Sequence, residues 1–503
     1  MNHTNSNSHL KNKVINSFQW TFFGTFVNII SQIAYTSVMG RLLNPEIYGV
    51  LALADTLLRF VSHFANMGVG KAVIQKEELS QSDLNVAFSL SFFLGLGFYG
   101  LVWLIAPFAS AYYDNILLKD VLRAIALNFV ISGIFATSGS VLRRNLQFNL
   151  TAKINIISSL FSHFIIGIGL AYMGYGIWSL VICSLVQSFT VGLWQYLSAV
   201  PRHNFHIIIS KEKYAAILKY GSMAAFSTFM EFLSVNFVTL IVGKVYGEII
   251  LGYYNRALLL AQLPAYYLVT SVSTVLFPAM SRIQKDIERL KKTYLRATSL
   301  ISFILLPAFT GLSIMAEVVI SVVLGNKWID STNTLQILAF TTPIIFHAHF
   351  GGIVLDAIAR IRLKIYNQFF YILQISLSIF AFVDYGMSGL AICVLTTDFT
   401  RCVLYMFYMS RILNISLKDI YKSLVPAFSA TLIVSSLLLV FQFVLHLFVL
   451  NLIPLITMMI GIVIGLIGMY ISIKLPFNKP IRSEIFMMSD KIKFLKKVQF
   501  IFR

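Results

Sequence analysis

Apolar stretches close to twenty residues long recur from one end of this chain to the other. Of its 503 residues, 58% are hydrophobic and only 12% are charged, whereas an ordinary globular domain is about 25% charged. A helix of about twenty apolar residues crosses a hydrocarbon core of roughly 30 Å. The pattern predicts an all-α polytopic membrane protein with about fourteen transmembrane helices. They are expected at Ser17–Met39, Ile47–Met67, Leu84–Phe108, Ala124–Val141, Ile154–Met173, Ile177–Val200, Tyr220–Val242, Leu258–Phe277, Leu300–Leu324, Leu335–Ile353, Ile365–Val383, Met387–Met409, Leu424–Leu447 and Leu452–Leu475.

The lysines and arginines give the expected orientation. Most of the 39 cationic residues lie in the loops and tail on the side that holds both termini, and cytoplasmic loops carry an excess of such residues. Both termini are therefore predicted to be cytoplasmic. The same distribution accounts for the net charge of +19, so nucleic acid is not expected as a partner. The three cysteines lie inside predicted helices, and neither a disulfide framework, a metal site nor a cofactor is expected.

Two short motifs suggest an internal repeat. GRLLNPEIYG at 40–49 and GKVYGEIILG at 243–252 both read glycine, a cation, seven more residues and glycine, with a glutamate inside. GYGIWSL from Gly174 and DYGMSGL from Asp384 match at a similar offset. We expect helices one to six and seven to twelve to form two parallel lobes, one of the symmetries found in transporters. The predicted regions are 1–200 (first lobe), 201–215 (cytoplasmic linker), 216–410 (second lobe), 411–475 (last two helices) and 476–503 (basic amphipathic cytoplasmic tail).

Polar residues inside the apolar segments mark candidate sites. In Ile47–Met67 the polar residues fall within about 100° of arc, and a charge at mid-membrane costs at least roughly 2.5 to 3.5 kcal/mol. Such faces are therefore expected to contact protein or water. The candidate cavity residues are Arg59, His63, Asn66, Asn28, Gln32, Tyr35, Ser227 and Arg256, and the candidate ion-coupling residues are Asp55 and Glu231.

Two pairs of opposite charge have a simpler interpretation. Asp55 and Arg59 are spaced to form an ion pair along one helix, and this alternative stays open beside the transport role. Asp398 and Arg401, three residues apart and without a comparable polar stripe, are interpreted as a structural pair.

Soluble-enzyme motifs are not supported. GLGFYG at 95–100 matches G-x-G-x-x-G, but it follows no strand and lies inside an apolar segment, which indicates close helix packing. No predicted outward loop is long enough to build a catalytic domain. The sequence therefore predicts a transporter and not an enzyme.

Three features carry a family resemblance. The run GRLLNPEIYGVLALAD, the run NRALLLAQLPAYYLVTSVSTVLFPAMSRIQ at 255–284 and the twofold six-helix layout resemble polysaccharide exporters of the multidrug/oligosaccharidyl-lipid/polysaccharide superfamily. The likeness is to the colanic-acid and O-antigen type of lipid-linked oligosaccharide flippase. It covers the first twelve predicted helices, and the last two match by hydropathy alone.

The resemblance implies a function and a place. Such a protein moves oligosaccharide repeat units linked to undecaprenyl pyrophosphate across the bacterial cytoplasmic membrane, by alternating access coupled to a proton or sodium gradient. The implied partners are that polyprenyl-pyrophosphate substrate and membrane lipids, with a polysaccharide polymerase and a chain-length regulator as further candidates. A drug cation antiporter of the same architecture is the main alternative, and a membrane glycosyltransferase or polymerase is a weaker one.

Overall fold

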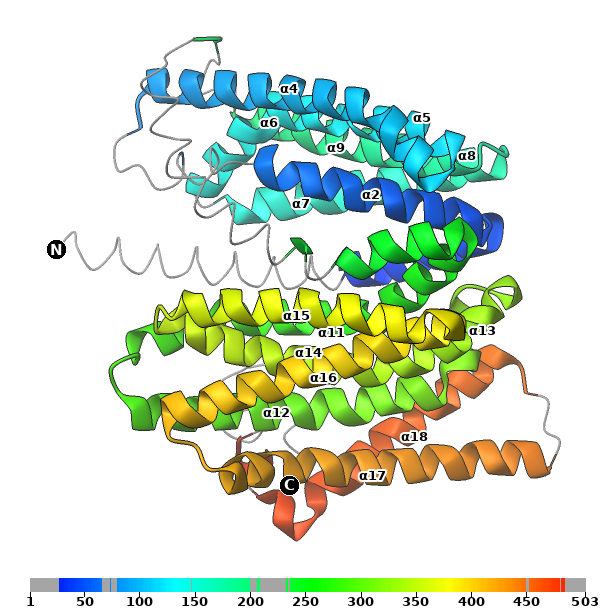
Figure 1. Cartoon of the computed structure of the whole chain (residues 1–503), viewed down its shortest axis with the longest axis vertical. Helices are drawn as coiled ribbons and strands as arrows, with labels where there is room; N and C mark the ends of the chain where they lie inside the picture. Colours follow the sequence, from blue (N-terminus) through cyan, green and yellow to red (C-terminus); the bar gives the residue numbers. More distant parts are fainter. Residues whose placement is uncertain are drawn as a thin grey trace. The chain divides into compact units, whose positions relative to one another are not determined.

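The computed structural model describes residues 27–65, 73, 79–145, 147–199, 206–208, 232–233, 236–448, 452–479 and 481–484. These residues are helical almost throughout, and they contain no strand (Figure 1). The chain divides into two compact units, Met1–Asn255 and Arg256–Arg503.

Unit 1 is built on α4, α6 and α9, with α4 packed on α6 and α6 packed on α9. Its other helices surround these three. In chain order the helices are residues 27–42, α2 (Pro45–Ala65), α4 (Gln81–Tyr113), α5 (Ile116–Ile125), α6 (Leu127–Arg144), α7 (Phe148–Leu160), the π-helix η1 (Phe161–Gly167), α8 (Ile168–Tyr172), α9 (Ile177–Ala199), Asn236–Val245 and the start of α11 (Gly247–Arg282).

Unit 2 is built on two helix pairs, α12 with α17 and α14 with α16. Figure 1 shows these long helices running side by side. After α11 the elements are α12 (Ile287–Ile314), α13 (Ala316–Val323), η2 (Asn326–Ser331), α14 (Thr332–Ala357), α15 (Ile361–Phe382), η3 (Val383–Tyr385), α16 (Gly386–Leu413), α17 (Leu417–Leu447), α18 (Pro454–Lys474) and η4 (Pro476–Asn478).

Ten helices in the described residues are long and apolar enough to cross a membrane. The expectation of an all-helical, multi-pass membrane protein is confirmed at this level. The four other predicted segments fall on helix 27–42, α2, Asn236–Val245 and α11, which are helical where they are described. The total of fourteen and the two-lobe repeat stay predictions.

Several helices begin at a polar cap that the sequence supplies. Ser80 and Asp83 form a capping box at the start of α4, and Ser416 and Asp419 form another at the start of α17. Asn115 accepts a hydrogen bond from the amide of Leu118, so α5 begins at Ile116. Caps of this kind satisfy backbone amides that have no partner within the helix. The crossing predicted at Ala124–Val141 therefore begins eight residues earlier.

The two repeated glycine motifs pack on one another inside unit 1. A Cβ at Gly49, in α2, would lie 1.8 Å from the carbonyl oxygen of Glu248. A Cβ at Gly252, in α11, would lie 1.9 Å from the carbonyl oxygen of Pro45. Each motif therefore places its second glycine against the backbone of the other motif. Because backbone atoms cannot rotate away as a flexible side chain can, neither position has room for a larger residue.

The GLGFYG motif divides into packed and open glycines. A Cβ at Gly95 would lie 2.4 Å from the carbonyl oxygen of Phe129, whereas Gly97 and Gly100 have nothing within 4 Å. In the same way, a Cβ at Gly133 of α6 would lie 2.6 Å from the carbonyl oxygen of Ser91 in α4. The predicted close helix packing is therefore confirmed at Gly95, and the other two glycines of the motif take no part in it.

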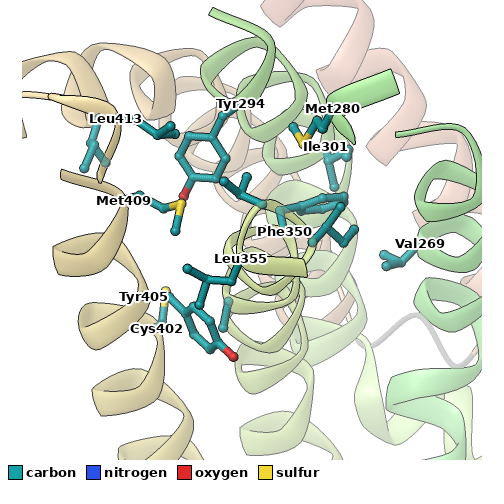
Figure 2. Close-up of a cluster of buried hydrophobic side chains, with 14 of the residues drawn as sticks. Val269, Met280, Tyr294, Ile301, Phe350, Leu355, Cys402, Tyr405, Met409 and Leu413 are labelled. Atoms are coloured by element: carbon teal, nitrogen blue, oxygen red, sulfur yellow. The ribbon is translucent and has the colours of Figure 1, made fainter. Parts of the chain in front are cut away.

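A large core cluster lies in unit 2. It joins α11, α12, α14 and α16 through side chains that include Tyr294, Phe350, Tyr405 and Met409 (Figure 2). Tyr294 and Phe350 are almost fully buried. Aromatic and thioether side chains of this size bury large areas, so they fix how α14 and α16 pack together.

The long apolar run at the end of the chain is divided as expected. α17 ends at Leu447, and α18 begins with Pro454 as its first residue, a position where proline fits a helix without losing a hydrogen bond. In the predicted basic tail at 476–503, the described residues form η4 and a helical turn at 481–484. The remainder of that tail lies outside the described residues.

Candidate functional site

The polar residues of α2 are partly exposed on unit 1. Asp55 is half-buried and Arg59 is exposed, while the neighbouring residues Leu53, Ala54 and Leu58 are buried. The hydroxyl of Ser62 donates to the carbonyl oxygen of Arg59 at 2.8 Å. α2 therefore packs in unit 1 through its apolar residues and leaves Arg59 exposed.

Helix 27–42 places its three candidate residues in two environments. Asn28 and Gln32 are half-buried, whereas Tyr35 is only 8% exposed. The Tyr35 ring stacks on the ring of His163, with centroids 4.3 Å apart and an interplanar angle of 14°. Tyr35 is therefore an internal contact of unit 1 in this structure.

A buried polar cluster surrounds this stack. The Nδ1 atom of His163 lies 3.2 Å from the hydroxyl of Ser159. Cys183 of α9 donates through Sγ to the carbonyl oxygen of Ser162 at 3.1 Å. Four elements thus meet at these residues: helix 27–42, α7, η1 and α9.

The π-helix η1 is the local cause of this arrangement. It runs from Phe161 to Gly167 between α7 and α8, and single-turn π-helices occur frequently at functional sites. A Cβ at Gly167 would lie 2.7 Å from the Tyr35 hydroxyl oxygen and 3.1 Å from the Cys183 sulfur. Glycine at this position lets Tyr35 reach the cluster.

The other candidates are placed as follows. Arg256 is half-buried in α11, at the start of unit 2. His63 belongs to α2, but its side chain lies outside the described residues. Asn66, Ser227 and Glu231 also lie outside them. Of the predicted set, the structure therefore describes the residues of α2 and of helix 27–42 within unit 1 and Arg256 in unit 2.

Unit 2 contains a buried ion pair on α16. Arg401 Nη2 lies 3.4 Å from Asp398 Oδ1, with side chains 16% and 2% exposed. The guanidinium carbon of Arg401 lies 4.8 Å from the centre of the Tyr371 ring in α15. The two charges of this pair therefore face one another inside the unit, as the structural interpretation of its spacing predicts.

Other buried polar groups lie on α14, α15 and α16. In this part of the described chain, several buried side-chain atoms have no hydrogen-bond partner, and burying such atoms is costly. They are Thr332 Oγ1, Thr334 Oγ1, His347 Nε2, Asn367 Nδ2 and Oδ1, Gln368 Oε1, Gln374 Oε1, Thr397 Oγ1, Asp398 Oδ1 and Arg401 Nε.

The sequence analysis missed His163 and Cys183. A lone histidine in an apolar segment gives no face at helical spacing, and η1 changes that spacing within the segment. The nearest usable signal is the unusually polar turn SSLFSH at 158–163. Among the described residues, no group of three or more histidine, cysteine, aspartate or glutamate side chains could hold a metal ion.

Known proteins resemble this chain in sequence and in fold. It is 27% identical over 439 residues to an uncharacterized membrane protein in the cps region of Klebsiella pneumoniae, with 86% of this chain and 89% of the relative covered. It is 23% identical over 407 residues to the lipopolysaccharide biosynthesis protein WzxC of Escherichia coli K12, covering 80% and 81%. The solved structure of the lipid II flippase MurJ in an inward closed conformation superposes with a TM-score of 0.70 at 18% identity, covering 92% of this chain and 99% of MurJ.

The structural likeness to MurJ shows that the two proteins share a fold. Membership of a family is shown by the match of this chain to the sequence profile of that family. That family is described as "Polysaccharide biosynthesis protein", and its profile matches residues 38–333, more than half of the chain. The matched region contains both glycine motifs and the run 255–284 that carry the resemblance to polysaccharide exporters. The chain therefore belongs to the polysaccharide biosynthesis protein family.

Proposed function

We propose that this protein is a membrane transporter that flips oligosaccharide linked to undecaprenyl pyrophosphate from the inner to the outer leaflet of the bacterial cytoplasmic membrane. Membership of the polysaccharide biosynthesis family supports this role, as does similarity to a lipopolysaccharide biosynthesis protein. The fold shared with a lipid II flippase is compatible with it. The exported unit would serve O-antigen, capsule or exopolysaccharide synthesis.

The exposed guanidinium of Arg59 is the observation that carries the substrate class. Arg59 belongs to α2, which packs in unit 1 through its apolar residues. A cation in a membrane segment needs water or an anionic partner, and a guanidinium group matches the geometry of phosphate oxygens. A pyrophosphate-linked lipid supplies that partner, whereas a drug cation would be repelled. Asn28 and Gln32 supply amide groups that suit the hydroxyls of a sugar.

Coupling to an ion gradient completes the proposal. Asp55 is half-buried one turn before Arg59, where a carboxylate can exchange a proton or bind sodium. Glu231, Ser227, His63 and Asn66 belong to the same proposal from sequence alone. A polysaccharide polymerase and a chain-length regulator are the proposed protein partners.

A deletion and complementation experiment tests the function. Cells that lack the gene should accumulate lipid-linked oligosaccharide on the cytoplasmic side, and the wild-type gene should restore export. Arg59→Ala should insert and fold at normal levels yet fail to export, and Arg59→Lys should restore part of the activity. Arg411→Ala is the matched control, because Arg411 is an exposed arginine at the end of α16 that packs against Phe407.

Two results would contradict this assignment. Full export by Arg59→Ala at normal protein levels would remove the phosphate role. Absence of oligosaccharide accumulation in the deletion strain, together with increased sensitivity to organic cations, would favour the drug antiporter instead.

The proposed orientation places both termini in the cytoplasm. Its support is the distribution of lysine and arginine over alternate loops. A cysteine at position 327 should react with an impermeant thiol reagent from outside, and one at position 291 should not. The background should be low because Cys183, Cys393 and Cys402 are all buried. Labelling in the opposite sense would invert the arrangement.

A further inference from the structure

His163 is a titratable group in the interior of unit 1, and the proposed function assigns it no role. Its side chain is buried, with 9% exposed, and it lies in the π-helix η1. Its ring is held on one face by Tyr35 and at its Nδ1 atom by Ser159.

The neighbours of the ring can serve either charge state. A hydroxyl such as that of Ser159 can donate to a neutral imidazole nitrogen or accept from its N–H. The face of an aromatic ring such as Tyr35 attracts a cation. Neutral imidazole and imidazolium can therefore both keep their hydrogen bonds here.

The titratable groups around the His163 ring do not fix its charge. Tyr35 from helix 27–42 and Cys183 from α9 are the titratable side chains that meet at this cluster. Lys153 of α7 precedes His163 by ten residues, which is about 15 Å along a helix. The described contacts of the ring, to Tyr35 and Ser159, are both to uncharged groups.

We propose that His163 binds and releases a proton during the transport cycle, and that its stack on Tyr35 transmits the change of charge to helix 27–42. That helix also carries Asn28 and Gln32 of the proposed cavity, so protonation and substrate contacts meet on one element. The inference rests on the proposed function, and it adds a proton site distinct from Asp55. Tyr35 packs where a Cβ at Gly167 would meet both its hydroxyl and the Cys183 sulfur, so its ring lies between η1 and α9.

Titration of the histidine itself tests the proton site without an export assay. The full-length protein, labelled with ¹⁵N-histidine, is reconstituted in lipid nanodiscs, and His163→Gln identifies the resonance. We expect the wild-type signal to titrate between about pH 5 and 8. Tyr35→Leu should lower the midpoint by about 0.5 pH unit, because it removes the aromatic face that attracts the imidazolium. A resonance that keeps one charge state across this range would overturn the inference.

Export under an imposed pH gradient then tests the role in transport. His163→Gln should remain at wild-type levels and lose the response of export to the gradient. His446→Gln, at an exposed histidine near the end of α17, should respond as the wild type does. If His163→Gln also responds like the wild type, the inference fails and the proposed function stands. If the wild type exports no oligosaccharide, the proposed function fails, and the nanodisc titration decides the proton site by itself.

Discussion

Two pairs of opposite charge lie on helices α2 and α16 of this protein, and they differ in what surrounds them. On α16, Asp398 and Arg401 are buried, 3.4 Å apart and packed against Tyr371. On α2, Asp55 is half-buried and Arg59 is exposed. The sequence spacing of the two pairs is almost the same.

The difference shows that spacing along a helix does not decide the role of a membrane charge. The α16 pair has its counter-charge and its aromatic contact inside the unit, so it needs no ligand. The Arg59 guanidinium on α2 is exposed, so its interactions must come from groups outside the core of unit 1. We expect substitutions at α16 to change stability and substitutions at α2 to change transport.

The largest expected effect is the loss of one partner from the buried pair. Arg401→Ala leaves the Asp398 carboxylate buried without its counter-charge, which should lower the free energy of unfolding by about 3 to 5 kcal/mol. Unfolding of the purified protein in detergent, with its level in membranes, measures this. Arg59→Ala is the matched control and should change stability by about 0.5 kcal/mol or less.

The double variant Asp398→Asn/Arg401→Leu checks the cause of that effect. Because it removes both charges, it should recover much of the stability that Arg401→Ala loses. Equal losses in Arg401→Ala and Arg59→Ala would erase the distinction between the two pairs.

The next largest stability effect is expected from lysine at the same two sites. Arg401→Lys keeps the charge but loses the planar group that lies against Tyr371, so it should cost about 1 to 2 kcal/mol. Arg59→Lys should leave the unfolding midpoint unchanged. A stability loss at position 59 as large as that at position 401 would mean that Arg59 is also an internal contact.

Asp55→Asn separates the two interpretations of the α2 pair. We expect a change in stability below about 1 kcal/mol, with loss of transport driven by an imposed ion gradient. Transport in membrane vesicles and unfolding in detergent are measured on the same preparation. If the variant is strongly destabilised and keeps its response to the gradient, Asp55 only neutralises Arg59.

The smallest effect should come from an exposed pair. Lys244 Nζ lies 2.9 Å from Asp114 Oδ2, but the two side chains are 39% and 81% exposed. Lys244→Ala should therefore change the free energy of unfolding by about 0 to 1 kcal/mol, and less at high salt. A loss comparable to that of Arg401→Ala would show that burial is not what distinguishes these pairs.

Hydropathy predicts where this chain crosses the membrane better than where its helices end. The break before Pro454 is confirmed because proline and a polar residue interrupt an otherwise continuous apolar run. The start of the crossing near residue 124 is missed because Lys119, Asp120 and Arg123 make α5 look like a loop. The buried residues Leu118 and Val121 nevertheless hold that turn in unit 1 as helix.

The candidate site was predictable only where polar residues keep a helical period. Asp55, Arg59 and Ser62 follow that period along α2, where Arg59 is exposed and the other two are half-buried. Tyr35 belongs to a similar stripe, yet it is buried against His163. Nothing in the spacing of Asn28, Gln32 and Tyr35 indicates the π-helix that makes room for that contact, because it arises from a different part of the chain.

The crossing of α2 and α11 at Gly49 and Gly252 has a consequence for how this sequence can vary. In a library that replaces every residue in turn, these two positions should reject even alanine, because the obstacle is a carbonyl group and not a side chain. Gly97 and Gly100, which face open space, should accept it. A neighbouring substitution cannot remove a backbone carbonyl, so drift in each motif is constrained by the backbone of a motif 203 residues away.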